Sequence, residues 1–159
     1  MVDNEALERA LESVMDPEVP VLSVMDLGLV RAIYQVKEVI HVDVAPTYTG
    51  CPAMDVIHER IKVSLEPFGE TIIHSVIDPP WTTDWMTEAG KKKLEAFGIA
   101  PPVGKASDKR TLWAPSPNVR CPRCKSERTD LVSLFGSTAC KSLYQCQDCN
   151  EPFDYFKCF

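Results

Sequence analysis

The hydrophobic pattern of residues 1–100 changes between helical and strand-like periods. Apolar side chains recur at helical spacing from Leu7 to Val14, which predicts a first helix. Residues 30–36 and 39–44 then alternate apolar and polar side chains. This alternation predicts two strands joined by a short turn. The chain therefore opens with a helix followed by a strand hairpin.

A second helix is predicted to start at residues 51–52, where proline suits the first helical position. Its expected apolar stripe is Met54, Ile57, Ile61 and Leu65. Residues 71–77 are short and β-branched, which predicts a third strand. A third helix should follow, with Gly98 as its C-terminal cap. The expected apolar face of this third helix is Trp85, Ala89, Leu94 and Phe97.

The order helix–strand–strand–helix–strand–helix predicts an α+β fold, with a small three-stranded sheet covered by helices on one face. Residues 101–118 are rich in Pro, Ser and Lys and are interpreted as a linker. Trp113 of this linker is expected to dock on another part of the protein. The expected domains are therefore residues 1–100 and residues 119–159.

The charge is uneven along the chain, although the formal net charge is only −6. Residues 1–100 carry 8 Lys and Arg against 17 Asp and Glu, which makes a poor nucleic-acid surface. No apolar run reaches the ~20 residues that a membrane helix needs. The chain also starts with acidic and polar residues rather than a secretory signal. We therefore expect a cytoplasmic protein without membrane contact.

Seven cysteines in a reducing compartment favour metal binding or thiol chemistry over disulfides. Two C-x-x-C pairs, "CPRC" at 121–124 and "CQDC" at 146–149, stand 21 residues apart. This spacing is typical of a zinc ribbon, which would extend through residues 119–159. A region of that size has too little core to fold without a metal. The predicted zinc ligands are Cys121, Cys124, Cys146 and Cys149, and they leave no open position for a substrate.

Cys140 and Cys158 are left over from this zinc set. They could be a second pair of ligands, a disulfide or buried packing residues. Tetrahedral thiolate sites also accept iron–sulfur clusters, so a cluster held by some of the six C-terminal cysteines is an alternative.

Cys51 stands apart, at the start of the second predicted helix. The backbone N–H groups and the helix dipole at such a position favour a thiolate. Two interpretations stay open from the residues alone, a reactive or metal-binding thiol and a buried packing cysteine.

The stretches "MDPEVPVLSVMDLGLV" and "APTYTGCPAMD" resemble the iron–sulfur-assembly domain of the SufT-like family. That family has an Asp-Pro-Glu motif after its first helix and a cysteine in a Thr-rich loop before its second. Asp16, Glu18 and Cys51 stand at those positions. The resemblance implies that Cys51 transiently binds iron or an iron–sulfur cluster, with Asp16 and Glu18 as supporting groups.

Nearly the whole chain, including "PPWTTDWMTEAGKKKLEAFGIAPP", "FGSTACKSLYQCQDC" and "EPFDYFKCF", is similar to the PaaD-like family of phenylacetate-degradation proteins. The resemblance implies an accessory or maturation protein of the multicomponent phenylacetyl-CoA monooxygenase, a 1,2-epoxidase of aerobic phenylacetate catabolism. Its expected partners are the oxygenase and reductase components and the iron–sulfur assembly machinery. The chain is not expected to be an enzyme by itself, because it lacks Glu-x-x-His pairs and a G-x-G-x-x-G motif.

Two other functions remain open. The protein could be a purely structural adaptor within the oxygenase complex. It could also be a nucleic-acid-binding zinc ribbon protein, but residues 119–159 carry only six basic against five acidic side chains. The sequence leaves homodimerisation open.

Overall fold

The computed structural model describes residues 2–104 and 118–157. Its residues pack into two compact units. The first comprises the chain up to Trp81 together with Trp85–Gly90, and the second comprises Thr82–Asp84 and the chain from Lys91 onward. Most of the predicted linker, including Trp113, lies outside the described residues. The predicted limits of independently folding domains, 1–100 and 119–159, stay predictions.

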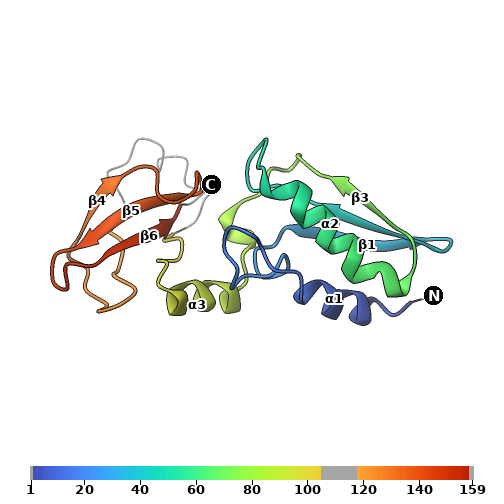
Figure 1. The fold of residues 1–159 in the computed structure, drawn as a ribbon, viewed down its shortest axis with the longest axis horizontal. Coiled ribbons are helices and arrows are strands. Elements are labelled where there is room, and N and C mark those ends of the chain that lie inside the picture. The colour runs from blue at the N-terminus through green and yellow to red at the C-terminus, as the bar shows by residue number, and fades with distance from the viewer. Residues whose placement is uncertain (1, 105–117, 158–159) are drawn as a thin grey trace. The chain divides into compact units, whose positions relative to one another are not determined.

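The first helix, α1, spans Asn4–Glu12 (Figure 1). Asp3 caps it, because its side chain accepts a hydrogen bond from the N–H of Glu5. Leu7 and Leu11 are fully buried on one face, as the periodicity predicted. The chain leaves the helix before Val14, which is nevertheless buried at 4% exposure.

A three-stranded sheet forms the middle of this unit. It consists of β1 (Val30–Val36), β2 (Val39–Val44) and β3 (Thr71–Ser75), in the order β1-β2-β3. β1 pairs with β2 antiparallel through a turn in which Lys37 has φ 59°, and β2 pairs with β3 parallel. Parallel neighbours need a crossover connection, and this one contains a helix.

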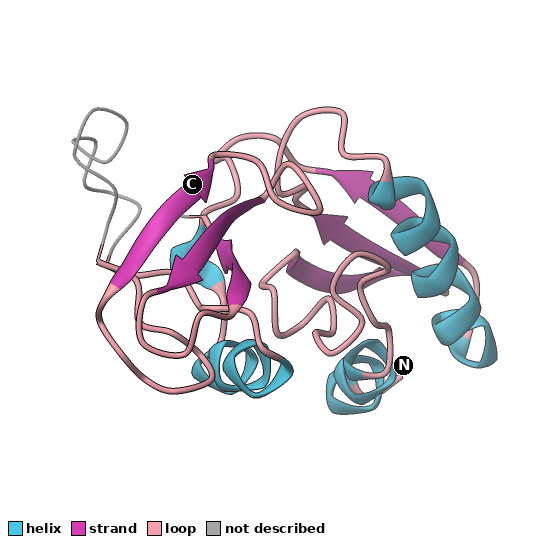
Figure 2. Ribbon diagram, turned by 60° about the vertical axis from the view of Figure 1, so that its left-hand side comes forward, coloured by secondary structure: helices cyan, strands magenta, loops and turns pink. Residues whose placement is uncertain are grey.

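That crossover helix, α2, spans Ala53–Leu65 and is followed by a 3₁₀ turn, η1, at Glu66–Phe68. Figures 1 and 2 show α2 lying against the sheet. The α2 side chains that face the core are Ala53, Ile57, Ile61 and Leu65. Met54 is only half-buried, so the predicted stripe is correct except at its first position. The three-stranded α+β fold with helices on one face is confirmed.

The third helix, α3, spans Glu88–Phe97, preceded by a 3₁₀ turn, η2, at Thr83–Trp85. Its predicted apolar face is wrong at Ala89 and Phe97, which are exposed, and right at Leu94, which is fully buried. The helix starts later than expected, so Gly90 takes the inner position one turn before Leu94. A Cβ at Gly90 would lie 3.0 Å from Cβ of Asp26, which leaves no room for a larger side chain.

The second unit contains an antiparallel sheet of β4 (Thr129–Ser133), β5 (Lys141–Cys146) and β6 (Pro152–Phe156). Its core is small and aromatic. Tyr144 packs against Phe153 and meets Tyr155 edge to face. These three rings are at most 6% exposed, so they hold the module together and are not free to stack on bases.

Within residues 2–104 and 118–157, no helix has both the length and the apolar character that crossing a membrane requires.

Candidate metal centre and functional thiol

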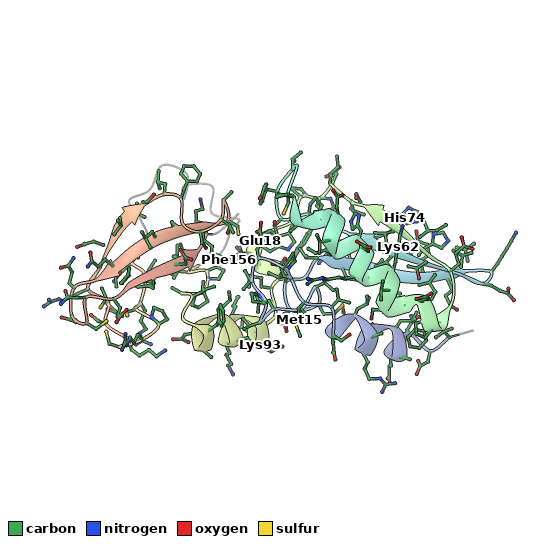
Figure 3. All side chains as sticks on the ribbon, viewed as in Figure 1. Met15, Glu18, Lys62, His74, Lys93 and Phe156 are labelled. Atoms are coloured by element: carbon green, nitrogen blue, oxygen red, sulfur yellow. The ribbon has the colours of Figure 1, made fainter. Side chains whose placement is uncertain are left out.

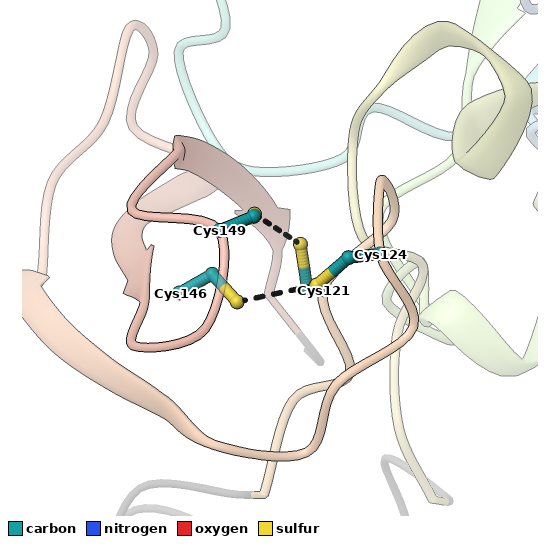
Figure 4. A group of neighbouring side chains, drawn as sticks. All are labelled: Cys121, Cys124, Cys146 and Cys149. Carbon is teal, nitrogen blue, oxygen red and sulfur yellow. Dashed lines mark hydrogen bonds between the residues drawn. The ribbon is translucent and has the colours of Figure 1, made fainter.

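The four cysteines predicted as zinc ligands converge in the second unit (Figure 4). Their sulfur atoms all lie within 4.8 Å of one another. Cys121 and Cys124 stand on a tight turn in which the N–H of Lys125 donates to the carbonyl oxygen of Cys121. The second turn follows β5, where the N–H of Cys146 donates to the carbonyl oxygen of Glu151. Two similar turns therefore aim four thiols at one point.

The sulfur separations fit a single tetrahedral metal ion. Sγ of Cys121 lies 3.8 Å from Sγ of Cys149, and Sγ of Cys124 lies 3.4 Å from Sγ of Cys146. With a metal–sulfur bond of about 2.3 Å, the sulfurs of a zinc tetrahedron stand about 3.8 Å apart. Cys121 and Cys146 are fully buried, whereas Cys124 is exposed. The donor set consists of sulfur alone and is complete for one ion.

The thiols influence each other's ionisation strongly. The backbone N–H of Cys149 stabilises the Cys146 thiolate and lowers the pKa of Cys146 to about 7. At Cys149, the backbone N–H of Glu151 favours the thiolate, but burial and the neighbouring thiols outweigh it and raise its pKa to about 12. Without a cation, neutral pH would therefore ionise only part of the set. A bound metal would supply the positive charge that lets every coordinating thiol deprotonate.

Polar contacts link the two cysteine turns at their surface. Arg123 on the first turn forms an ion pair with Glu151 beside the second. Arg128 and Asp148 form another, with 3.0 Å between nitrogen and oxygen. All four side chains are well exposed, so each pair contributes little stability and chiefly fixes the register of the two turns.

Cys51 lies immediately before the N-cap of α2, which is Pro52. Its thiol is buried at 8% exposure, and its backbone N–H donates to the carbonyl oxygen of Tyr48 over 3.3 Å. Its own carbonyl oxygen accepts from the N–H of Met54. The local turn therefore fixes the backbone of Cys51 at the helix start, in the first compact unit and away in the chain from the four-cysteine group.

Asp16 shapes the loop that follows α1. Its side chain is buried at 7% exposure, and Oδ1 accepts hydrogen bonds from the N–H groups of Glu18 and Val19 at 2.8 and 2.7 Å. Its own N–H donates to the carbonyl oxygen of Leu22. Glu18 is half-buried on the same loop (Figure 3). One oxygen of Asp16 is thus committed to backbone structure, and the role of both carboxylates in ligand binding stays a prediction.

Cys140 is buried at 4% exposure just before β5 and does not join the four-cysteine group. Its sulfur lies 3.0 Å from the hydroxyl oxygen of Thr138. Cys158 lies outside the described residues, so the pairing of these two thiols stays open.

Two polar arrangements were not predicted from the sequence. Ser23 and Asp26 form two reciprocal hydrogen bonds between side chain and backbone. The N–H of Ser23 donates to Oδ2 of Asp26, and the N–H of Asp26 donates to the Ser23 hydroxyl oxygen. The spacing of the stretch "SVMD" could have indicated this. His41 and His74 also meet across two strands, at 2.9 Å between ring nitrogens. The alternation of apolar and polar residues in β2 places His41 on the face away from the core. No pattern in the neighbouring sequence predicts that His74 is its partner.

Two family models match the chain in succession. Residues 4–79 match the model described as iron–sulfur cluster assembly protein. Residues 105–157 match the model described as PaaD zinc beta ribbon domain. The fold and the cysteine site thus define a two-part protein, an assembly-type α+β unit followed by a zinc ribbon.

Individual relatives agree with this division. The chain is 47% identical over 150 residues to an Escherichia coli protein named as a component of 1,2-phenylacetyl-CoA epoxidase, covering 93% of this chain and 88% of the relative. It is 35% identical to the Fe-S protein maturation auxiliary factor YitW of Bacillus subtilis, over 57% of this chain and 91% of that one. The chain belongs to the PaaD family.

Among solved structures, the chain is similar to a domain of unknown function from Bacillus anthracis, with a TM-score of 0.53 and 28% identity. The match covers 57% of this chain and 89% of that chain. It supports the fold of the N-terminal part.

Proposed function

We propose that this protein is an accessory maturation factor of a phenylacetyl-CoA epoxidase, and that Cys51 is its functional thiol. The observation that carries the proposal is the position of Cys51, directly before α2 and inside the segment that matches the iron–sulfur cluster assembly model. The Escherichia coli relative named as an epoxidase component, which aligns over 93% of this chain, supplies the client.

In this proposal the iron or cluster is cargo rather than a resident cofactor. The Cys51 thiolate binds it transiently, and a partner protein supplies further ligands, because one cysteine cannot hold a cluster by itself. Cys51 is only 8% exposed, so the loop before α2 must open locally for the cargo to reach the sulfur. Asp16 contributes by holding the backbone of its own loop through Glu18 and Val19.

The four-cysteine group has a separate, structural role in this proposal. Cys121, Cys124, Cys146 and Cys149 would hold one zinc ion, which their separations fit better than a cluster. Ligands of a cluster bind different iron atoms and stand farther apart than ligands of one ion. A zinc ion with four protein ligands has no open position for a substrate. The protein therefore acts with the oxygenase and reductase components and does not catalyse epoxidation alone.

The test is co-expression of the Cys51→Ser variant with the oxygenase and reductase components. Serine is close in size to cysteine, so folding and zinc content should persist. We expect the iron content of the oxygenase and its epoxidase activity to fall together. Cys140→Ser is the matched control, because Cys140 is an equally buried thiol in the other unit. If Cys51→Ser matches wild type in both measurements, Cys51 is a packing residue.

A second candidate, a structural adaptor, is favoured by an exposed apolar tip on the ribbon. Val132, Leu134 and Phe135 are 56%, 63% and 68% exposed. Lys157 orders this tip, since its ammonium group donates to the carbonyl oxygen of Leu134 and lies 4.7 Å from the Phe135 ring centroid. An adaptor would lose its complex with the oxygenase in a Phe135→Ser variant and keep full function in Cys51→Ser.

A further inference from the structure

The face of the first sheet opposite the helices carries chemistry that the proposed function does not use. Ile40, Val42 and Val44 of β2 are fully buried, so the alternate residues of that strand point to the other face. His41 pairs with Tyr34 of β1, which is 40% exposed. The open face of this sheet therefore presents a histidine in its central strand.

A second histidine joins it from the neighbouring strand. Asp43 of β2 pairs in register with His74 of β3, so His74 occupies the same face as His41. His41 and His74 are diagonal neighbours, a separation that aromatic side chains can bridge. Nδ1 of His41 lies 2.9 Å from Nε2 of His74. Both side chains are half-buried, so water reaches the pair.

The rings meet edge to edge. Their planes differ by 3° and their centroids are 5.2 Å apart, while the facing nitrogens are only 2.9 Å apart. Tyr34 extends the row, with its ring parallel to His41 within 6° and its centroid 5.1 Å away. The simplest description is an N–H···N hydrogen bond between two imidazoles. Such a bond needs a proton on one facing nitrogen and a lone pair on the other.

We infer that His41 and His74 form a binding site for a divalent first-row metal ion of the nickel or copper type, with water completing the coordination. Imidazole nitrogen suits these cations, and mixed nitrogen and oxygen ligands in square or tetragonal geometry are typical of them. At a metal–nitrogen distance of about 2.0–2.1 Å, nitrogens at neighbouring corners of a square lie about 2.9 Å apart. The observed separation matches this spacing. The facing nitrogens point at each other in the hydrogen bond, so both rings must rotate to direct their lone pairs at one ion.

Binding requires no redox partner and releases no net proton. The cation loses two water ligands and gains two metal–nitrogen bonds. The proton between the facing nitrogens moves through solvent to the other nitrogen of the same ring, which leaves both imidazoles neutral. Asp43, the register partner of His74, lies on this face, but its carboxylate is not grouped with the two imidazoles at metal-ligand distance. Residues 1–100 carry 17 acidic against 8 basic side chains, and this excess also attracts a cation.

The site is chemically distinct from the four-cysteine group. It offers nitrogen instead of sulfur, belongs to the first compact unit, and leaves coordination positions to water. It does not depend on the role proposed for Cys51.

The test uses full-length protein with zinc already bound at the ribbon and a Cys51→Ser/Cys140→Ser/Cys158→Ser background, so that free thiols do not compete. Ni²⁺ is titrated by calorimetry, and the imidazole signals are followed by NMR, where the paramagnetic ion broadens nearby resonances. We expect one Ni²⁺ per chain and selective broadening of the His41 and His74 rings. Either His41→Gln or His74→Gln should weaken binding by about tenfold or more, since loss of second-layer partners alone costs about 10–100-fold.

His58→Gln is the matched control, because His58 is the remaining histidine of the three in the chain. It should bind Ni²⁺ like the parent. The double variant His41→Gln/His74→Gln should lose the binding that either single variant keeps, with a total loss smaller than the sum of the two single losses, as expected for two ligands of one ion. Retained zinc and an unchanged circular dichroism spectrum show that each variant is folded. If one single variant does not fold, the other is enough to test the site. Wild-type affinity in a folded His41→Gln or His74→Gln variant overturns the site.

Discussion

The two units of this molecule are held together in different ways. The first has a conventional core, in which Leu11 of α1, Ile61 of α2 and Ile40 of β2 are fully buried. The second has few buried apolar side chains, and two members of its core cluster, Cys121 and Cys146, are also in the four-sulfur group. The two units therefore differ in what fills their interiors. Buried aliphatic side chains fill the first, whereas two cysteines of the sulfur group are part of the small core of the second.

The largest effect should come from breaking the sulfur group. A Cys124→Ser variant, or chelation of the metal, should unfold the second unit and leave the first folded. Binding of zinc to such modules supplies about 10–16 kcal/mol, which is also their folding free energy. Metal analysis should show loss of the bound zinc. Amide NMR spectra should show collapsed signals for β4–β6 and unchanged signals for β1–β3.

Cys140→Ser provides the comparison for this prediction, since Cys140 is a buried ribbon thiol outside the group. It should keep its zinc. A Cys124→Ser protein with full metal content and an intact ribbon spectrum would show that the four cysteines are not the stabilising set.

A core substitution in the first unit should have a smaller effect than loss of the metal. It should destabilise the first unit and leave the ribbon unchanged. Ile61→Ala removes a fully buried side chain from α2 and should lower the free energy of unfolding of this unit by about 2–5 kcal/mol. Urea unfolding followed at amide signals of each unit measures it. Zinc content should stay at the wild-type level, as expected for a ribbon that folds around its own metal.

Val63→Ala on the same helix is the control, because Val63 is 64% exposed. Its effect should stay within about 0.5 kcal/mol. If Ile61→Ala and Val63→Ala lower the free energy of unfolding equally, burial of Ile61 does not contribute to the stability of this unit.

The sequence predicted what depends on local spacing. Hydrophobic periods placed α1, α2 and the β1–β2 hairpin, and the two C-x-x-C pairs predicted four sulfurs that converge. It did not predict what depends on distant partners. The parallel pairing of β2 with β3 creates the His41–His74 contact from residues 33 positions apart, and no local pattern contains it. The expected apolar face of α3 is wrong at Ala89 and Phe97 because the helix starts only after η2, which places Gly90 one turn before the buried Leu94.

The smallest expected effect concerns pH, and it should be confined to the first unit. Nε2 of His58 on α2 is buried and has no hydrogen-bond partner among the described residues. Burial lowers the pKa of His58 from 6.5, Asp55 opposes this shift, and Lys62 adds to it. The unfolded chain therefore binds a proton at a higher pH than the folded chain does. Stability from the neutral imidazole is present above pH 6.5 and is lost as the pH falls through 6.5 and below. The opening constant of α2, obtained from amide exchange after correction for the intrinsic exchange rate, should rise over that window, and His58→Gln should remove the dependence there. The ribbon strands serve as the internal reference, and an unchanged pH profile of α2 in the His58→Gln variant would show that another group is responsible.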